Sequence, residues 1–440
     1  MDDFVPQPVI HTLQDAGGRI YSVGGTVRDT LLGRARKDID LLVTGLPQQT
    51  LIQCLRRHGR VQLIGRAFGV LQFRPRRWQG PPIDIALPRT EISTGIGHRD
   101  FDVSFDHTLP IETDLGRRDF TINALAIDLA DGQLIDPFGG RQDLENRLLR
   151  QVSPQAFPED PLRMLRGIQL AARFGLVIES STQQAMLTHA QSIVTIAPER
   201  IAEELGKLFQ APSPASGFVL MQITGLLAPL MPELDALAAI VKPFTRTMQR
   251  LDAVQQSPEV RHRGNLDLLL AALLQDSGYP DADAPTAART ARERLESLRM
   301  TVIGAQLNLI ESLICESRLE VGALASDAAL RHFAHRVSPA TAKMVFDLRL
   351  SDRLTYAPDH TAAEWLGLQE RLQREIDNGA PLTVQDLAID GHDLQRLGIS
   401  PGPKMGKLLV YLLDQVLDDP SRNTPNHLID LAQRETASQA

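Results

Sequence analysis

The sequence predicts an α+β fold, with a small mixed sheet near the N-terminus and an all-helical remainder. In the first part, short β-like runs alternate with glycine turns, as is typical of a compact sheet domain. These runs are residues 19–23, 39–43, 60–64, 70–73 and 83–87. Beyond about residue 160, apolar residues recur with a helical period. A chain of 440 residues also exceeds what one core usually supports, so two or more domains are expected.

Local signals predict where each element begins and ends. The first strand stops at Gly24-Gly25, and residues 27–32 predict a short amphipathic helix that ends at Gly33. Residues 91–116 are rich in Gly, Asp, His and Thr, and this composition predicts a long loop. Breaks between the later helices are expected where Pro, Gly or Ser gather, at residues 212–214, 232, 277–278 and 401–403.

The composition is that of an ordinary globular protein, with 43% apolar and 23% charged residues. The net charge of −8 does not favour a nucleic-acid ligand. The excess of acidic residues lies mainly beyond residue 210, however, so a basic surface on the first half stays compatible with the sequence. No apolar run approaches the roughly 20 residues that span a bilayer. The two cysteines, Cys54 and Cys315, predict neither a disulfide framework nor a metal site, which favours a cytoplasmic location.

The strongest chemical signal is the segment 24–29, Gly-Gly-Thr-Val-Arg-Asp, followed by Asp38 and Asp40. Paired glycines let the backbone approach a ligand, and N–H groups at a helix start suit phosphate. Asp38 and Asp40 are two residues apart on a strand, so their side chains share a face. A lone pair of this kind is more often a solvated strand end. Its spacing from the glycine turn favours a shared cation, and oxygen ligands with room for phosphate suit Mg²⁺.

This segment resembles the first motif of the class II tRNA nucleotidyltransferase and bacterial poly(A) polymerase family, within the DNA polymerase beta superfamily. Later segments match in order. They are similar to the family's ribose-binding motif, connecting turn, nucleotide-selecting helix and last neck motif, at residues 117–125, 136–140, 159–166 and 199–205. The resemblance is close over residues 19–209. It implies a polymerase-beta-like nucleotidyltransferase head followed by a helical neck, body and tail.

The resemblance makes Asp38 and Asp40 the catalytic, metal-holding residues, with Mg²⁺ as the cofactor. An in-line displacement by the tRNA 3′-hydroxyl would then release pyrophosphate. Asp84 lies on a later strand and is left open as a third carboxylate, because many relatives lack it.

The same resemblance assigns the nucleotide-binding residues of the head. Gly25, Arg28 and Arg118 match positions that contact the triphosphate, and a guanidinium fork fits phosphate oxygens. Asp119 would read the ribose 2′-hydroxyl. Taken alone, residues 117–119 are more typical of a surface ion-pair cluster.

Asp160 and Arg163 are expected to select the base. At positions i and i+3 of a helix their side chains share a face, and a carboxylate with a guanidinium suits the pairing edges of C and A. Arg166 continues this face and would meet phosphate. Relatives often carry another basic residue where this chain has Gln169, so one phosphate contact is missing or replaced.

The resemblance implies template-independent addition of CMP and AMP from CTP and ATP to the tRNA 3′ end, with no membrane and no obligate protein partner. Poly(A) polymerases and enzymes that add only CC or A share this core and stay open as alternatives. Residues 89–101 are similar to the flexible loop of CCA-adding enzymes, and the acidic C-terminal half lacks a basic tail for unstructured RNA. An inactive RNA-binding protein would be expected to lose Asp38, Asp40 or Arg163, and this chain keeps all three.

Four parts are predicted: a head at 1–145, a neck at 146–212, a body at 213–360 and a tRNA-binding tail at 361–440. The body contains a remnant of the HD phosphohydrolase domain that some relatives carry. Arg246 and Gln275 stand where that domain has histidine ligands, so no phosphohydrolase activity is predicted, and Asp276 is expected to be a helix cap. In the tail, Lys404 and Lys407 at a helix start are equally suited to solvent or to the tRNA backbone.

Overall fold

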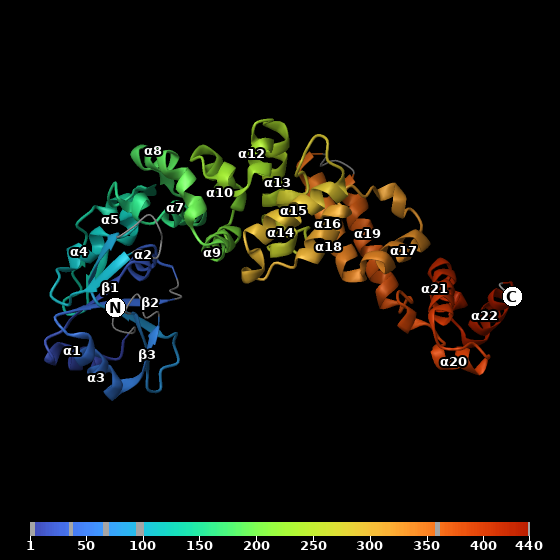
Figure 1. The fold of residues 1–440 in the computed structure, drawn as a ribbon, viewed down its shortest axis with the longest axis horizontal. Coiled ribbons are helices and arrows are strands. Elements are labelled where there is room, and N and C mark those ends of the chain that lie inside the picture. The colour runs from blue at the N-terminus through green and yellow to red at the C-terminus, as the bar shows by residue number, and fades with distance from the viewer. Residues whose placement is uncertain (1–4, 35–37, 65–69, 94–100, 357–360, 439–440) are drawn as a thin grey trace. The chain divides into compact units, whose positions relative to one another are not determined.

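The computed structural model describes residues 5–34, 38–64, 70–93, 101–356 and 361–438. By their internal contacts, the residues form two compact units (Figure 1). The first unit is Met1–Ala211 with Ser216–Pro232, and the second is Pro212–Ala215 with Glu233–Ala440. The finer division into head, neck, body and tail stays a prediction.

The first unit contains a seven-stranded mixed sheet in the order β3-β4-β5-β2-β1-β8-β9. Strands β2 and β5 run parallel, whereas the other neighbouring strands pair antiparallel. The small mixed sheet expected from the sequence is therefore confirmed. The strands are β1 Arg19–Val23, β2 Ile39–Thr44, β3 Gly59–Ile64, β4 Val70–Pro75, β5 Ile83–Ala86, β8 Ala126–Asp128 and β9 Leu134–Ile135.

Helices and two small strand pairs complete the elements that precede residue 232. The helices are α1 Gln7–Asp15, α2 Gly25–Leu31, α3 Gln48–His58, α4 Ile111–Gly116, α5 Gly140–Glu145, α6 Ala156–Glu159, α7 Leu162–Phe174, α8 Ser180–His189, α9 Pro198–Phe209, α10 Pro214–Ile223 and α11 Leu227–Leu230, with 3₁₀ turns at Thr121–Asn123 and Ala190–Thr195. The small pairs are β6 Arg89–Ser93 with β7 Phe101–Phe105, and β10 Leu148–Leu149 with β11 Val177–Ile178.

Alternation along β2 separates the two faces of the sheet. Ile39, Leu41 and Val43 pack in one core with α1 and α3. Leu42 packs in a second core with Ile111 and Leu115 of α4. Asp40 lies between Ile39 and Leu41 and therefore shares the face of Leu42, away from α1 and α3. The apolar pattern of one strand thus directs this carboxylate to the α4 side of the sheet.

The long loop predicted over residues 91–116 is wrong for the described part of that segment. Strands β6 and β7 pair antiparallel, and α4 follows after Pro110. Phe101, Val103 and Phe105 alternate with polar residues, which is a strand signal that the Gly- and His-rich composition hid. Residues 94–100, including His98, lie outside the described residues.

Beyond residue 232 the described elements are helical, as the sequence predicts. These helices are α12 Pro232–Ala238, α13 Lys242–Gln256, α14 Leu266–Leu274, α15 Ala284–Ser297, α16 Leu307–Cys315, α17 Asp327–Val337, α18 Pro339–Tyr356, α19 Thr361–Asp377, α20 Gly391–Arg396, α21 Pro403–Asp418 and α22 Pro425–Ser438, with 3₁₀ turns at Met300–Ile303, Val321–Leu324, Val384–Asp386 and Pro420–Arg422. The expected breaks at 212–214, 232, 277–278 and 401–403 all fall at or between helix ends. Within the described residues, no helix has both the length and the apolar character needed to cross a membrane.

Candidate active site

Three carboxylates gather at one end of the sheet. Asp40 on β2 lies directly opposite Asp84 on β5 in the parallel register, and Asp38 immediately precedes β2. Burial, opposed by Arg118 and reinforced by Asp84 and Asp38, raises the pKa of Asp40 to about 6. Asp84, left open from the sequence, is therefore a structural neighbour of the Asp38–Asp40 pair.

The Asp84 carboxylate has unused capacity for a ligand. Its Oδ1 is buried and has no hydrogen-bond partner. Burial also raises the pKa of Asp84, and Asp38 adds to this effect. Among the described residues, no group of three or more His, Cys, Asp or Glu side chains is close enough to hold a metal alone. A cation here would therefore take part of its coordination from phosphate and water, as Mg²⁺ does in nucleotide sites.

The glycine turn and the carboxylate strand are joined by Thr26. Its Oγ1 accepts from Asp40 N at 3.0 Å and donates to Asp38 O at 3.3 Å. Gly24 has φ +64°, and a Cβ there would lie 2.5 Å from Arg118 Nη1. The turn therefore favours glycine for its left-handed backbone, and the Arg118 guanidinium lies directly against it.

Arg28 on α2 is buried and held from several sides. Its Nε donates to Asp29 Oδ1 at 2.9 Å, and its Nη1 donates to Asn123 Oδ1 at 2.6 Å. Gly25 faces the same guanidinium, because a Cβ built on it would lie 3.5 Å from Arg28 Nη2. Arg28 and Asn123, which the sequence places in two separate motifs, are thus in contact.

Arg118 is positioned by a fully buried carboxylate, Asp114 of α4. Asp114 Oδ2 accepts from Arg118 Nη2 at 3.1 Å, and its Oδ1 accepts from Arg117 Nη2 at 2.6 Å. Burial opposes ionisation, but Arg118 and Arg117 outweigh it and lower the pKa of Asp114. Sequence reasoning missed Asp114, because it lies in the segment predicted to be a loop.

Asp119 connects the head to helix α7. Its Oδ1 accepts from Phe120 N at 2.8 Å and from Asn123 Nδ2 at 3.0 Å, and its Oδ2 accepts from Arg166 Nη1 at 3.4 Å. Burial is again outweighed, first by Arg166, and the pKa of Asp119 is lowered. Arg166 also lies 3.6 Å from Glu204 on α9. A continuous polar chain therefore runs from Arg28 through Asn123 and Asp119 to α9.

The expected helical pair of Asp160 and Arg163 is corrected by the structure. Helix α7 begins at Leu162, so Asp160 precedes it and accepts from Leu162 N at 3.2 Å. Asp160 Oδ2 pairs with Arg200 on α9 at 3.1 Å. The buried Arg163 guanidinium donates to Ala156 O at 3.2 Å and Glu159 Oε2 at 3.1 Å. Pro161 moves the helix start past Asp160, since proline fits only the first helical turn.

Most of the predicted residues thus come together around one polar chain. The residues missed by sequence reasoning are Thr26, Asp114, Asn123, Arg200 and Glu204. Four of these lie inside the recognised motifs, which was the signal that could have found them. Their contacts depend on pairing between segments far apart in the chain.

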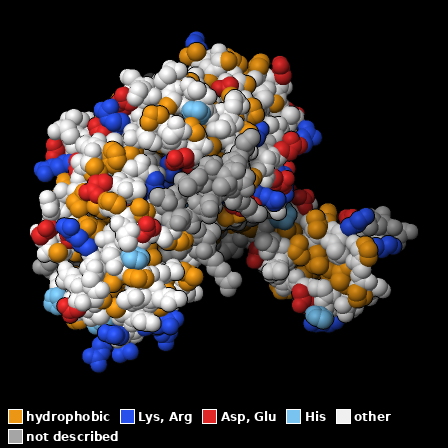
Figure 2. Space-filling model, turned by 60° about the vertical axis from the view of Figure 1, so that its left-hand side comes forward, with side chains coloured by type: hydrophobic (Ala, Val, Ile, Leu, Met, Phe, Trp, Pro, Cys, Tyr) orange, Lys and Arg blue, Asp and Glu red, His pale blue; other side chains and the backbone are white. Residues whose placement is uncertain are grey.

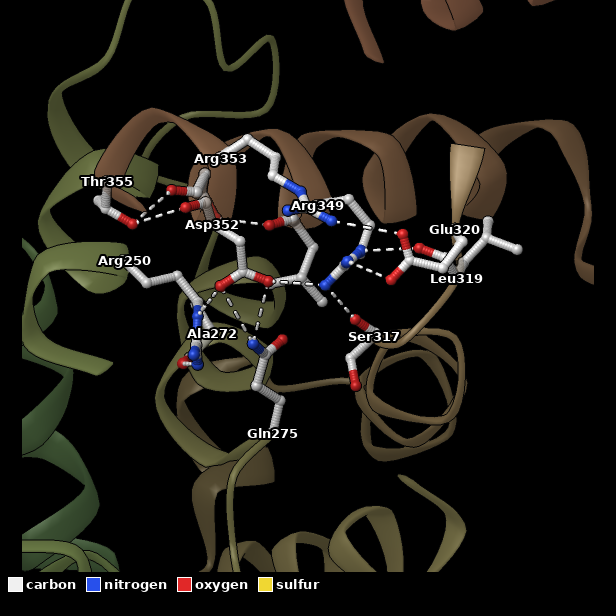
Figure 3. A network of polar contacts seen from close by, with 12 residues as sticks. Arg250, Ala272, Gln275, Ser317, Leu319, Glu320, Arg349, Asp352, Arg353 and Thr355 are labelled. Atoms are coloured by element: carbon white, nitrogen blue, oxygen red, sulfur yellow. Dashed lines mark hydrogen bonds and ion pairs between the residues drawn. The ribbon is translucent and has the colours of Figure 1, made fainter. Parts of the chain in front are cut away.

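The HD-like region of the second unit contains an internal cation (Figure 3). The buried Arg250 donates from Nη2 to Asp276 Oδ2 at 2.6 Å and from Nε to Asp352 Oδ1 at 2.5 Å. Its Nη1 donates to Ala272 O at 2.8 Å. Asp276 is therefore an ion-pair partner, and the expectation that it caps a helix is wrong. Arg250, one turn beyond Arg246, supplies the positive charge beside these carboxylates.

Surface charge gives little further guidance. On the face drawn in Figure 2, positive, negative and apolar side chains are interspersed among the described residues. This mixture agrees with the modest net charge of −8. The residues that argue for a ligand are therefore those of the polar chain.

Comparison with family models agrees with this geometry. Residues 20–150 match the poly(A) polymerase head domain, residues 175–237 match the RNA and SrmB-binding site of polymerase A, and residues 364–432 match tRNA nucleotidyltransferase domain 2. The fold and the site define a protein with a nucleotidyltransferase-type head and a helical remainder. Over these residues the chain is similar to the poly(A) polymerase head domain and to tRNA nucleotidyltransferase domain 2.

Curated relatives include the multifunctional CCA proteins of Xanthomonas campestris and Pseudomonas aeruginosa. The chain is 39% identical to the first over 227 residues, which is 50% of this chain and 53% of that protein. It is 38% identical to the second over 271 residues, which is 59% of this chain and 63% of that protein. The chain thus spans about half to three fifths of the length of these relatives.

Solved structures show the same fold over nearly the whole chain. The CCA-adding enzyme of Bacillus stearothermophilus in complex with CTP has a TM-score of 0.73 at 24% identity, covering 98% of this chain and 97% of that one. The Thermotoga maritima CCA-adding enzyme complexed with tRNA has a TM-score of 0.66 at 24% identity, covering 98% and 94%.

Proposed function

We propose that this chain is a nucleotidyltransferase that adds CMP and AMP from CTP and ATP to the 3′ end of tRNA, releasing pyrophosphate. The observation that carries the proposal is the placement of Asp40 and Asp84 side by side, within electrostatic reach of Arg118 and Arg28. Carboxylates for a cation next to guanidinium groups for phosphate are what phosphoryl transfer requires. The names of the curated relatives, multifunctional CCA proteins, support the choice of tRNA and of the CCA sequence.

We propose Mg²⁺ as the cation, held by Asp38 and Asp40 with Asp84 as a neighbour. Both carboxylates suit a bound cation. It would give the unpartnered Asp84 Oδ1 a partner, and it would favour the ionised form of Asp40, whose pKa is raised in its absence. When bound, Mg²⁺ would neutralise charge on the triphosphate and on the attacking oxygen.

The chain's own residues would bind and orient the nucleotide. Arg28 and Arg118 would donate hydrogen bonds to phosphate from fixed positions, since Asp29 and Asp114 hold their guanidinium groups in place. Asp119 lies where the ribose-reading residue is expected, with Arg166 on one oxygen. Asp160 and Arg163 would read the base, and the Arg200 contact would keep Asp160 in position.

The tRNA would contact the helical parts, with the neck at 146–212 selecting the nucleotide and the tail at 361–440 gripping RNA. The matches of residues 175–237 and 364–432 to RNA-processing domains support this assignment. We also propose a cytoplasmic location, because both Cys54 and Cys315 are free thiols.

The test is an incorporation assay with purified protein, Mg²⁺ and tRNA that lacks its 3′-CCA, with CTP and ATP supplied separately and together. Addition that stops after CCA supports the proposal. Long A-tracts from ATP alone would instead identify a poly(A) polymerase, and products that end at CC or require CC would identify a partial enzyme. Absence of incorporation would overturn the enzymatic assignment.

A further inference from the structure

Three guanidinium groups surround one aromatic ring beside the glycine turn. Phe174 is the last residue of α7. The Cζ atoms of Arg28 and Arg34 each lie 4.5 Å from its ring centroid, and the Cζ of Arg173 lies 5.4 Å from it. Each distance is within the range of a cation–π contact. The ring therefore holds three positive charges together where α2 and α7 meet.

Carboxylates compensate only part of this charge. Arg28 pairs with Asp29 at 2.8 Å. Among the described residues, the side chains of Arg34 and Arg173 have no carboxylate within ion-pair distance. Burial, together with Arg28 and Arg34, lowers the pKa of Arg173, although Asp29 partly offsets the repulsion. An arginine in the last turn of a helix ordinarily interacts favourably with the helix dipole. Two further guanidinium groups close to it are unfavourable, because like charges repel. The arrangement is suited to an added anion.

Gln169 explains how Arg173 is held. The Gln169 side chain is buried, and its Oε1 accepts from Arg173 Nη1 at 3.1 Å. The two residues are one helical turn apart, so they lie on the same face of α7. The buried glutamine therefore holds the Arg173 guanidinium from one turn earlier in the helix.

We propose that Arg173, positioned by Gln169 and joined by Arg34, binds the outer phosphates of the incoming nucleoside triphosphate. This inference rests on the proposed function. Its ligand is a phosphate group, either of the nucleotide's triphosphate or of the RNA backbone. The nucleotide is favoured because Arg28 shares the Phe174 ring with Arg173 and also joins the polar chain to Asn123 and Asp119.

The experiment compares binding of CTP and CMP by calorimetry, with Mg²⁺ present, to the wild type and to Arg173→Ala and Arg34→Ala. We expect Arg173→Ala to lower the affinity for CTP roughly tenfold and the affinity for CMP by less than about twofold, because CMP has no outer phosphates. Arg57→Ala, which removes an exposed charge from α3 of the same unit, is the matched control and should change neither affinity. Arg173→Gln is a second variant that keeps side-chain length, and circular dichroism checks that each variant is folded.

A double-mutant comparison tests the positioning role of Gln169. Gln169→Ala should lower the affinity for CTP in the wild-type background but should have no further effect on it when Arg173 is already alanine. In steady-state assays the single variants should raise KM for CTP more than they lower kcat.

Several results would overturn the inference. Equal loss of CTP and CMP affinity would make Arg173 a structural residue. Weaker tRNA binding with unchanged CTP affinity would assign the phosphate to RNA. Unchanged binding of all ligands would refute the site. The wild type is measured first: if it neither binds CTP nor incorporates it, the proposed function itself fails, whereas a functional wild type with an unaffected Arg173→Ala variant refutes only this inference.

Discussion

At the scale of single residues, the chemistry depends on a carboxylate held in an unfavourable place. Asp40 is surrounded by Asp84, Asp38, Arg118 and Arg28, and its pKa is raised from 3.8 to about 6. The folded state therefore holds a proton that the unfolded chain releases at lower pH. Between about pH 4 and pH 6 the folded state binds more protons, so its stability falls as the pH rises through this window.

Asp40→Asn should reveal how much the buried Asp40 carboxylate destabilises the folded state. At pH 7.5 and without metal, we expect the variant to be more stable than the wild type, by on the order of 1 kcal/mol or more, because it removes a buried charge. Incorporation should fall by at least roughly a hundredfold, because the cation loses a ligand. Thermal melts between pH 4 and pH 8, with and without Mg²⁺, measure both effects. A variant less stable than the wild type at pH 7.5 would contradict the burial argument.

Metal affinity should follow the same titration. Below about pH 6 a cation competes with the proton on Asp40, so apparent Mg²⁺ affinity should weaken by up to about tenfold for each unit of pH. Titrating Mg²⁺ against the melting temperature at several pH values would measure this. In Asp40→Asn the pH dependence should largely disappear.

Asp160 governs selection of the base in the proposed function. Asp160→Ala should relax the choice of nucleotide and raise UMP incorporation relative to CMP by roughly tenfold, because it removes the acceptor for an exocyclic amino group. Its requirement for Mg²⁺ should be unchanged. Arg200→Ala should shift selectivity in the same direction by less, because Arg200 only holds Asp160 in position. Unchanged selectivity in Asp160→Ala would refute the base-reading role.

At the scale of elements, short helices position the site from outside the sheet. Helix α4 packs Ile111 and Leu115 into the core and directs the fully buried Asp114 toward Arg117 and Arg118. Composition alone concealed this helix, because its six residues are preceded by a segment rich in Gly, Asp and His. A local element that the sequence predicted as loop thus holds Arg118, the side chain proposed to bind phosphate.

Asp114→Ala should separate stability from binding. Removing the buried partner of two arginines should cost about 2–4 kcal/mol, less than a fully buried pair because both guanidinium groups are partly exposed. The KM for CTP should also rise, since Arg118 loses its support. Urea unfolding and steady-state kinetics measure the two effects. A stability loss with an unchanged KM would limit Asp114 to a structural role.

At the scale of the whole molecule, two units with separate internal contacts carry different chemistry. The first contains the acidic and basic groups of the candidate active site. The second contains Arg250, which pairs with Asp276 and, as Figure 3 shows, with Asp352, so a fixed cation is part of its interior. A bound metal would be redundant beside that guanidinium, in agreement with the expected absence of phosphohydrolase chemistry.

Arg250→Met should destabilise the second unit by about 3–5 kcal/mol, because it removes the buried counter-charge of Asp276 and one of the arginines that pair with Asp352. Calorimetry should resolve a transition that moves in this variant and one that does not. Adding Asp276→Asn and Asp352→Asn should recover much of the loss, and EDTA should leave the affected transition unchanged. A shift of both transitions together would show that the units unfold as one.

The sequence by itself determined the α+β class, the five strands of the head from β1 to β5, the helical breaks and the order of the motifs. These depend on local alternation, on Gly and Pro, and on residue spacing, which neighbouring residues specify. The two-residue spacing of Asp38 and Asp40 likewise indicated, without knowledge of the fold, that their side chains share a face.

Only the tertiary structure decided which distant groups meet. The register of β2 against β5 places Asp84 opposite Asp40, and the packing of α7 and α9 brings Arg166 to Glu204 and Arg200 to Asp160. Packing in the second unit likewise brings Arg250 to Asp276. Such contacts depend on backbone register, helix rotation and burial, which many residues set together. No local pattern specifies them, so the chemistry of the site follows from packing.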